Sequence, residues 1–362
     1  MISQKCKTKE WIETVAATNK ADKILVEKVI RALFLLEGLS ESGISYLFKG
    51  GTALMLLLQS EKRLSIDIDI IVPDHSGGFA DILKKCCENK GFNNFEKKER
   101  SAEINIDKEH YKLFFISALN NQESHIMLDV LREDVMYLNV IEMLVDSRFV
   151  TQENAPAIVK LPDYNNILGD KLTAFAPNTT GIPYRKGGKE MGMEIIKQMY
   201  DIGCLFDKAD KPEIVSEVFA RFASTELKYR GSDSRINDVL DDIIETALSI
   251  CLRQSQGKAD FTILSKGIVQ VKPFIFSEAF HLEKAIAYAA KVAYTATVIK
   301  FKVKYFSRFN KEQDMKDWVI TTPANTKLNK IKKTDPEAFY YLYQMSEIVK
   351  NILFTVSNIQ DG

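Results

Sequence analysis

Apolar and polar residues follow different patterns in the two parts of this 362-residue chain. Up to about residue 162, apolar residues at helical spacing predict helices over 8–41 and 79–90, the first with Asp22 as a candidate cap. Segments rich in β-branched and aromatic residues predict strands at 44–49, 66–72, 102–107, 111–117, 125–131 and 157–161. This pattern predicts an α+β domain built on a small mixed sheet.

From residue 163 onward, only the helical period remains. It predicts helices at 163–176, 189–206, 211–228, 233–254, 278–300 and 335–356. A loop over 177–188, with two Pro and three Gly, separates the first two of these helices. We therefore expect two domains of ordinary size, an α+β domain over 1–162 and an all-helical domain over 163–362.

The composition favours helices and excludes several classes of protein. Gly (17) and Pro (9) are scarce, which favours long helices over an all-β fold with many turns. Lys plus Arg and Asp plus Glu both number 49, so any contact with nucleic acid must come from a local basic patch. Five cysteines without metal-ligand spacing indicate a reduced, cytoplasmic protein. No apolar stretch approaches the ~18 residues that a membrane span needs.

The segment 66–72 carries the first candidate chemistry, because its apolar and polar residues alternate strictly. Ile66, Ile68 and Ile70 share one face of the predicted strand, while Asp67 and Asp69 share the other. Two carboxylates beside a core are costly unless they bind a cation. Hard carboxylate oxygens, completed by substrate phosphates, suit Mg²⁺.

The second candidate feature is the diglycine at Gly50 and Gly51, followed by Thr52 and an apolar helix over 53–58. Without Cβ atoms, this backbone can approach a phosphate closely, and the helix start directs free N–H groups at an anion. Thr52 adds a hydroxyl. Together, a phosphate cradle and a two-carboxylate strand favour metal-assisted transfer from a nucleoside triphosphate. Alone, each would indicate only a turn or a solvated strand edge.

At this point the sequence resembles a known family. Gly50–Leu54 with Arg63–Asp69 resembles the first two motifs of the AbiEii/AbiGii toxin nucleotidyltransferases, in the DNA polymerase β-like superfamily. Asp170–Ala174 resembles the lysine motif of this family, and Lys197–Ile202 its later basic and aspartate motif, with Gln198 in place of an Asp. The resemblance covers roughly residues 30–210.

The resemblance implies a Mg²⁺-dependent enzyme that transfers a nucleoside monophosphate from an NTP to an acceptor. Some members are toxins beside an antitoxin, and some modify tRNA ends, so a cognate antitoxin and an RNA acceptor are the implied partners. Asp67 and Asp69 would bind Mg²⁺, and Lys171, positioned by Asp201, would neutralise developing phosphate charge. The implied nucleotide-binding residues are Gly50, Gly51, Thr52, Arg63 and Ser65.

The superfamily also implies a third carboxylate on a neighbouring strand, and Asp129 is the best candidate. Asp129 could equally be a structural carboxylate that caps its strand. Arg63 could contact phosphate or pair with Glu61, and Lys171 and Asp201 could be solvated residues of amphipathic helices.

Three basic segments are also open to two interpretations. The loop 185–189 and the segments 300–305 and 327–333 could contact RNA, or they could be exposed structure. The function alternatives are a non-catalytic module that binds nucleotide or a partner protein, and a transferase with a small-molecule acceptor.

Overall fold

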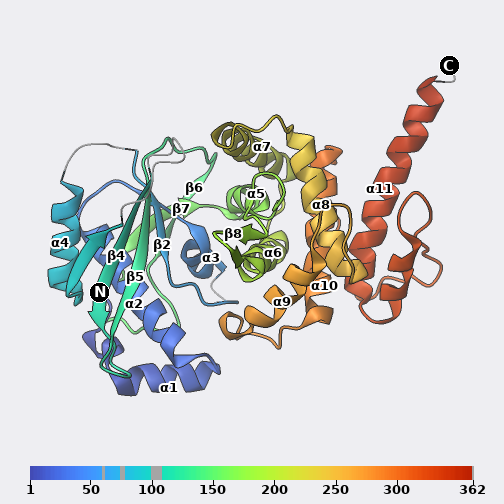
Figure 1. The fold of residues 1–362 in the computed structure, drawn as a ribbon. Helices are drawn as coiled ribbons and strands as arrows, with labels where there is room; N and C mark the ends of the chain where they lie inside the picture. Colours follow the sequence, from blue (N-terminus) through green and yellow to red (C-terminus); the bar gives the residue numbers. More distant parts are fainter. Residues whose placement is uncertain (59–61, 74–77, 99–107, 361–362) are drawn as a thin grey trace. The chain divides into compact units, whose positions relative to one another are not determined.

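The computed structural model describes residues 1–58, 62–73, 78–98 and 108–360. Within it the chain forms two compact units, one of Met1–Asp163 with Pro273–Ala279, the other of Tyr164–Lys272 with Phe280–Gly362 (Figure 1). Two features expected from the sequence, the strand at 102–107 and the candidate Arg63 partner Glu61, lie outside the described residues.

The first unit contains a five-stranded mixed sheet with the order β1-β2-β5-β4-β3. Its pairings are antiparallel, except that β2 and β5 run parallel. In Figure 1, α4 lies next to β3 at one edge, and α3 lies next to β1 and β2 at the other. The elements are η1 (Gln4–Lys7), α1 (Lys9–Asn19), α2 (Lys23–Glu41), β1 (Leu47–Lys49), α3 (Gly50–Leu58), β2 (Ile68–Ile71), α4 (Phe79–Lys90), β3 (Asn94–Lys97), β4 (Lys108–Ile116), β5 (Glu123–Leu131), β6 (Val140–Leu144) and β7 (Ile158–Pro162).

The second unit is largely helical. Its central helix is α10, which contacts α6, α7, α8, α9 and α11. The elements are α5 (Tyr164–Ala174), β8 (Arg185–Lys186), β9 (Lys189–Glu190), α6 (Gly192–Phe206), α7 (Pro212–Tyr229), α8 (Ile236–Leu252), α9 (Phe261–Gln270), α10 (Leu282–Lys300), η3 (Thr326–Lys333) and α11 (Pro336–Gln360), with η2 (Lys272–Phe274) at the junction of the units. The mixed sheet followed by helices confirms the predicted α+β class.

Several element boundaries differ from the sequence predictions. The single helix predicted over 8–41 is wrong: Lys20 adopts a left-handed conformation (φ 52°) that ends α1, and Asp22 then caps α2 by accepting hydrogen bonds from Ile24 and Leu25. The strand at 157–161 exists as β7, but it pairs with β6 in a separate two-stranded sheet. Helix α9 and strands β3 and β6 were not predicted.

The start of α3 is the correction that matters most for the site. The helix expected from Ala53 begins at Gly50, directly after β1, so the diglycine forms its first turn. Among the described residues, we find no helix with both the length and the apolar character needed to traverse a bilayer.

Candidate functional site

Side chains from four neighbouring strands form one row across the sheet of the first unit. Asp69 on β2 is the register partner of Asp129 on β5, and it also pairs with Lys49 on β1. His110 on β4 is the register partner of Asp129 from the other side. Register partners point to the same face on strands about 4.8 Å apart. We call Lys49, Asp69, Asp129 and His110 the cross-strand row.

The opposite face of the same strands is hydrophobic. Ile68 and Ile70 on β2, and Leu128 and Val130 on β5, are fully buried. Asp67 lies just before β2 and is exposed, while Asp69 is half-buried. The predicted alternation of the isoleucines and aspartates is therefore confirmed for residues 67–70, because the core anchors one face and leaves the other to the carboxylates.

The first turn of α3 lies directly against this row. Gly50 has a φ of +80°, and a Cβ at this position would collide with Oδ2 of Asp69 and lie 2.8 Å from its Cγ. A Cβ at Gly51 would lie 2.6 Å from Oγ of Ser65 and 3.0 Å from Nη2 of Arg63. A side chain at Gly50 would be strained by the backbone conformation, and one at Gly51 would displace the Ser65 and Arg63 side chains. The sequence motifs at 50–52 and 63–69 therefore meet in space.

Thr52 and Arg63 hold this arrangement together. Thr52 is fully buried, and its hydroxyl donates a hydrogen bond to the backbone carbonyl of Asp67 over 2.6 Å. Buried Arg63 donates from Nη1 to the carbonyl of Leu64 over 3.0 Å. Because the Thr52 hydroxyl is bonded to Asp67, the groups that α3 offers to an anion are the backbone N–H groups of its first turn.

Asp129 has close contacts at both carboxylate oxygens. Nδ1 of His110 lies 2.6 Å from its Oδ1, and Nζ of Lys108 lies 3.0 Å from its Oδ2. His110 is only 4% exposed, against 21% for Asp129 and 31% for Lys108. The sequence analysis missed both neighbours of Asp129, because they depend on the exact register of the β4–β5 hairpin.

The donor set of this site suits a hard cation. Asp67 and Asp69 supply carboxylate oxygens, the ligands that Mg²⁺ prefers. Within the described part of the chain, no group of three or more His, Cys, Asp or Glu side chains is placed to hold a metal ion.

In the second unit, the two predicted helical residues form a buried ion pair. Nζ of Lys171 on α5 lies 3.1 Å from Oδ2 of Asp201 on α6, and their side chains are 10% and 2% exposed. Lys171 also donates to Oε1 of Gln198 over 3.0 Å. The alternative that these are solvated helix residues is therefore wrong. The amide of Gln198 still binds Lys171 in place of the carboxylate expected there.

The three basic segments, 185–189, 300–305 and 327–333, lie in the second unit. Several of their Arg and Lys side chains form ion pairs or hydrogen bonds. Arg185 and Lys189 lie on the exposed β8–β9 hairpin, where Arg185 pairs with Glu190 and Asp260. Lys300 pairs with Asp241, and Lys332 in η3 donates to the carbonyl of Trp318 over 3.0 Å. These contacts do not distinguish RNA binding from exposed structure.

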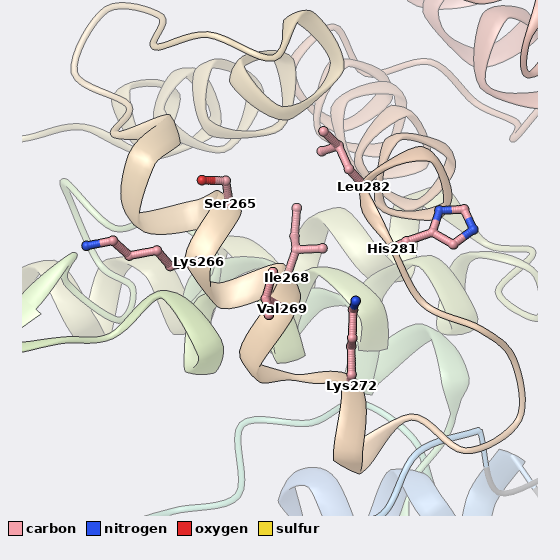
Figure 2. A pocket seen from close by; sticks show the side chains of 7 residues that line it. All are labelled: Ser265, Lys266, Ile268, Val269, Lys272, His281 and Leu282. Carbon is pink, nitrogen blue, oxygen red and sulfur yellow. The ribbon is translucent and has the colours of Figure 1, made fainter.

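Two surface pockets lie away from the predicted site residues. Figure 2 shows one of about 370 Å³ in the second unit, between α9 and the start of α10. Its lining residues are Ser265, Lys266, Ile268, Val269, Lys272, His281 and Leu282. A pocket of about 380 Å³ in the first unit lies between α3 and residues 142–148. Neither is lined by a predicted catalytic or nucleotide-binding residue.

Comparisons with known proteins were made for the sequence and for the fold. MenT4, a nucleotidyltransferase toxin from Mycobacterium tuberculosis, has a similar fold, with a TM-score of 0.53, 12% identity, and coverage of 92% of this chain and 98% of that chain. JHP933 from Helicobacter pylori aligns with a TM-score of 0.41 and 14% identity, over 78% of this chain and 94% of that chain. Among curated proteins, none matches.

One family model matches the sequence itself. The model described as "Nucleotidyl transferase AbiEii toxin, Type IV TA system" matches residues 32–272, well over half of the chain. The matched segment contains the diglycine, the aspartate strand and the buried Lys171–Asp201 pair. The resemblance noted from the motifs is thereby confirmed. The chain belongs to the AbiEii nucleotidyl transferase family, the toxins of type IV toxin–antitoxin systems.

Proposed function

We propose that this toxin transfers a nucleoside monophosphate from an NTP to a hydroxyl of an RNA acceptor, and that Mg²⁺ is its cofactor. Family membership implies the NTP and a cognate antitoxin. The single observation that carries the proposal is the contact between Gly50 and the Asp69 carboxylate. A phosphate that approaches the first turn of α3 would lie beside the carboxylates that suit a cation.

The residues divide into groups with distinct roles. Asp67 and Asp69 would hold Mg²⁺, which neutralises charge on the phosphate oxygens when bound. The backbone at Gly50, Gly51 and Thr52 would hold the triphosphate. The side chains of Arg63 and Ser65 lie against Gly51. They would support the first turn of α3 and belong to the proposed nucleotide-binding residues. Lys171, held by Asp201, would neutralise charge that develops on the transferred phosphate.

The chemistry is a single in-line displacement. The acceptor hydroxyl oxygen forms a bond to the α-phosphorus, the bond from the α-phosphorus to the bridging oxygen breaks, and pyrophosphate leaves. A carboxylate oxygen of Asp129 accepts the hydroxyl proton. This role is supported by the register of Asp129, which places it beside Asp69 on the same face of the sheet.

The RNA acceptor is proposed from the resemblance to a family in which some members modify tRNA ends. Arg185, Lys186 and Lys189 on the exposed β8–β9 hairpin are compatible with contact to a phosphate backbone. We also propose a cytoplasmic setting, which is supported by the five buried free cysteines.

The test is label transfer from each of the four NTPs to total RNA in the presence of Mg²⁺. We expect incorporation by the wild type, and a loss of about 10³-fold or more in Asp67→Asn and Asp69→Asn, since each removes charge at the proposed cation site. The exposed Asp81→Asn on α4 is the matched control and should keep full activity. Circular dichroism checks that each variant is folded.

Each contrary outcome has a distinct meaning. Full activity in Asp67→Asn would remove the proposed site. NTP binding in titration calorimetry without incorporation would favour the non-catalytic module. Label on a small molecule instead of RNA would contradict only the acceptor class.

A further inference from the structure

The carboxylate of Asp129 is held unequally at its two oxygens. Oδ1 faces His110, which is almost fully buried and lies directly across the β4–β5 ladder, with 2.6 Å between Nδ1 and Oδ1. Oδ2 faces Lys108, 3.0 Å away, on a side chain nearly one-third exposed. One oxygen is therefore fixed by a rigid partner, and the other is held by a flexible ammonium group.

The direction of the hydrogen bond follows from the chemistry of the two groups. An ionised carboxylate only accepts hydrogen bonds, so Nδ1 of His110 carries the proton and donates. An imidazole has only two side-chain torsions, and a position opposite Asp129 in an antiparallel ladder restricts both. His110 therefore limits rotation of the Asp129 carboxylate.

The two contacts also differ in how readily they can be exchanged. His110 would have to leave a buried position to release Oδ1. Lys108 carries its ammonium on a flexible four-carbon chain with access to solvent, so water or a hydroxyl can replace it at low cost. An entering acceptor would therefore meet Oδ2 and not Oδ1.

We propose that His110 is a positioning residue of the transfer reaction, which holds Oδ1 of Asp129 so that Oδ2 faces the acceptor hydroxyl and takes its proton. Lys108 occupies Oδ2 until the acceptor displaces it. This inference rests on the proposed function, in which Asp129 is the base. It adds His110, which lies outside the segments that carry the family motifs, and it gives the two oxygens of Asp129 different roles.

The opposing explanation is that His110 and Asp129 form only a structural cross-strand pair. Three substitutions separate the two explanations. His110→Asn places an amide N–H close to the position of Nδ1, His110→Gln places it close to Nε2, and His110→Phe keeps a ring without a donor. His125 at the other end of the β4–β5 ladder contacts the ring of Phe114, and His125→Phe is the matched control.

The experiment measures kcat and KM for the NTP in transfer to RNA, beside the thermal unfolding midpoint of each variant. We expect His110→Phe to lower kcat by about 10- to 100-fold, a part of the 10²–10⁴ that a general base contributes. KM for the NTP should stay within about twofold, because Asp129 acts on the acceptor. His110→Asn should recover most of kcat, and His125→Phe should match the wild type.

Several results would overturn the proposal. Wild-type kcat in His110→Phe would do so, as would equal losses in His110→Asn and His110→Phe, or a change confined to KM. If His110→Phe does not fold, the comparison of His110→Asn with His110→Gln decides, since only the former keeps a donor at Nδ1.

Failure of this inference is distinguishable from failure of the proposed function. An active wild type with inactive Asp67→Asn and Asp129→Asn, and with unimpaired His110→Phe, overturns only the role of His110. Full activity in Asp129→Asn would contradict the role of Asp129 as the base, and with it the positioning role of His110. A wild type that transfers no nucleotide contradicts both.

Discussion

The two units hold their candidate site charges in different environments. In the first unit the carboxylates are partly accessible, with Asp67 exposed and Asp129 contacted by Lys108, whose side chain is nearly one-third exposed. In the second unit Lys171 and Asp201 are enclosed between α5 and α6, with Gln198 as a third partner. The accessible acids can exchange ligands, whereas Lys171 is held in one position by Asp201 and Gln198. The two units therefore differ in how freely their candidate site charges can move.

The largest expected effect tests the enclosed pair. Lys171→Met leaves the buried carboxylate of Asp201 without its cation, which should lower the free energy of unfolding by about 3–5 kcal/mol. Asp67→Asn, at an exposed position, should change it by less than about 0.5 kcal/mol. Urea denaturation measures both values.

A double variant sharpens this result. Lys171→Met with Asp201→Leu removes both charges, so it should recover most of the stability while transfer stays impaired. If Lys171→Met and Asp67→Asn were equally stable, the contrast between the two units would be wrong.

The next effect tests the close contact in the first unit. Gly50→Ala and Gly43→Ala both place a Cβ on a left-handed backbone, with φ of +80° and +76°, and each should cost about 1–2 kcal/mol of stability. Only the Cβ at Gly50 meets the Asp69 carboxylate, because Gly43 has open space around it. Gly50→Ala should therefore also lower transfer by about 100-fold, as a displaced catalytic group does.

The measurements for this pair are thermal unfolding and label transfer on the same samples. Equal transfer activity in the two alanine variants would show that Asp69 tolerates displacement.

The smallest effects compare a half-buried lysine in the first unit, Lys7, with a buried lysine in the second, Lys291. Burial, with the positive charges of Arg31 and Lys90, lowers the pKa of Lys7 to about 8. Burial would also lower the pKa of Lys291, but Asp207 and Glu337 outweigh it and raise this pKa to about 12. The cost of burying the Lys7 ammonium group is therefore not offset by nearby acids, whereas Asp207 and Glu337 offset it for Lys291.

Replacement by Met should change stability in opposite directions. Lys7→Met should stabilise the protein by about 1 kcal/mol, after allowance for solvent screening of this half-exposed group. The gain should be complete below pH 8 and vanish as the pH rises toward 10.5, because the folded pKa lies below the unfolded value of 10.5. Lys291→Met should destabilise by about 1 kcal/mol. Denaturation at pH 7 and pH 10 measures both, and a pH-independent gain in Lys7→Met would contradict the assignment.

The local features of the site could be predicted from the sequence. Asp67 and Asp69 lie two residues apart next to buried isoleucines, so alternation alone placed them on one face. The diglycine before an apolar helix was also a local signal. The sequence predicted that the diglycine and the aspartate strand act together, but not that Gly50 contacts Asp69. That contact is determined by the antiparallel register of β1 and β2.

A turn rule predicts the β4–β5 hairpin and the face on which His110 lies, but not its exact partner. Asn121 adopts a φ of 58° in the turn between β4 and β5, and Asn-Asn is a turn signal. A turn centred on Asn120 and Asn121 would pair residue 110 with residue 131. In the structure the loop is centred between residues 119 and 120, which pairs residue 110 with residue 129. The distance between Lys171 and Asp201 had no such local signal, since it depends on how α5 packs against α6.

The strands that were missed are short or lack alternation. Strand β3 has only one residue that is not exposed, and β6 carries Val140 and Leu144 on its exposed face. Neither shows the alternation of apolar and polar residues that identifies a half-buried strand.

The segment Pro273–Ala279 has a topological consequence. It packs with the first unit, where the carbonyl of Phe274 accepts a hydrogen bond from Leu64 and the hydroxyl of Ser277 donates to the carbonyl of Lys62, directly before the aspartate strand. The chain therefore passes between the two units three times. A single proteolytic nick after Asp163 would not release an intact first unit, because its missing piece would remain covalently joined to the other fragment.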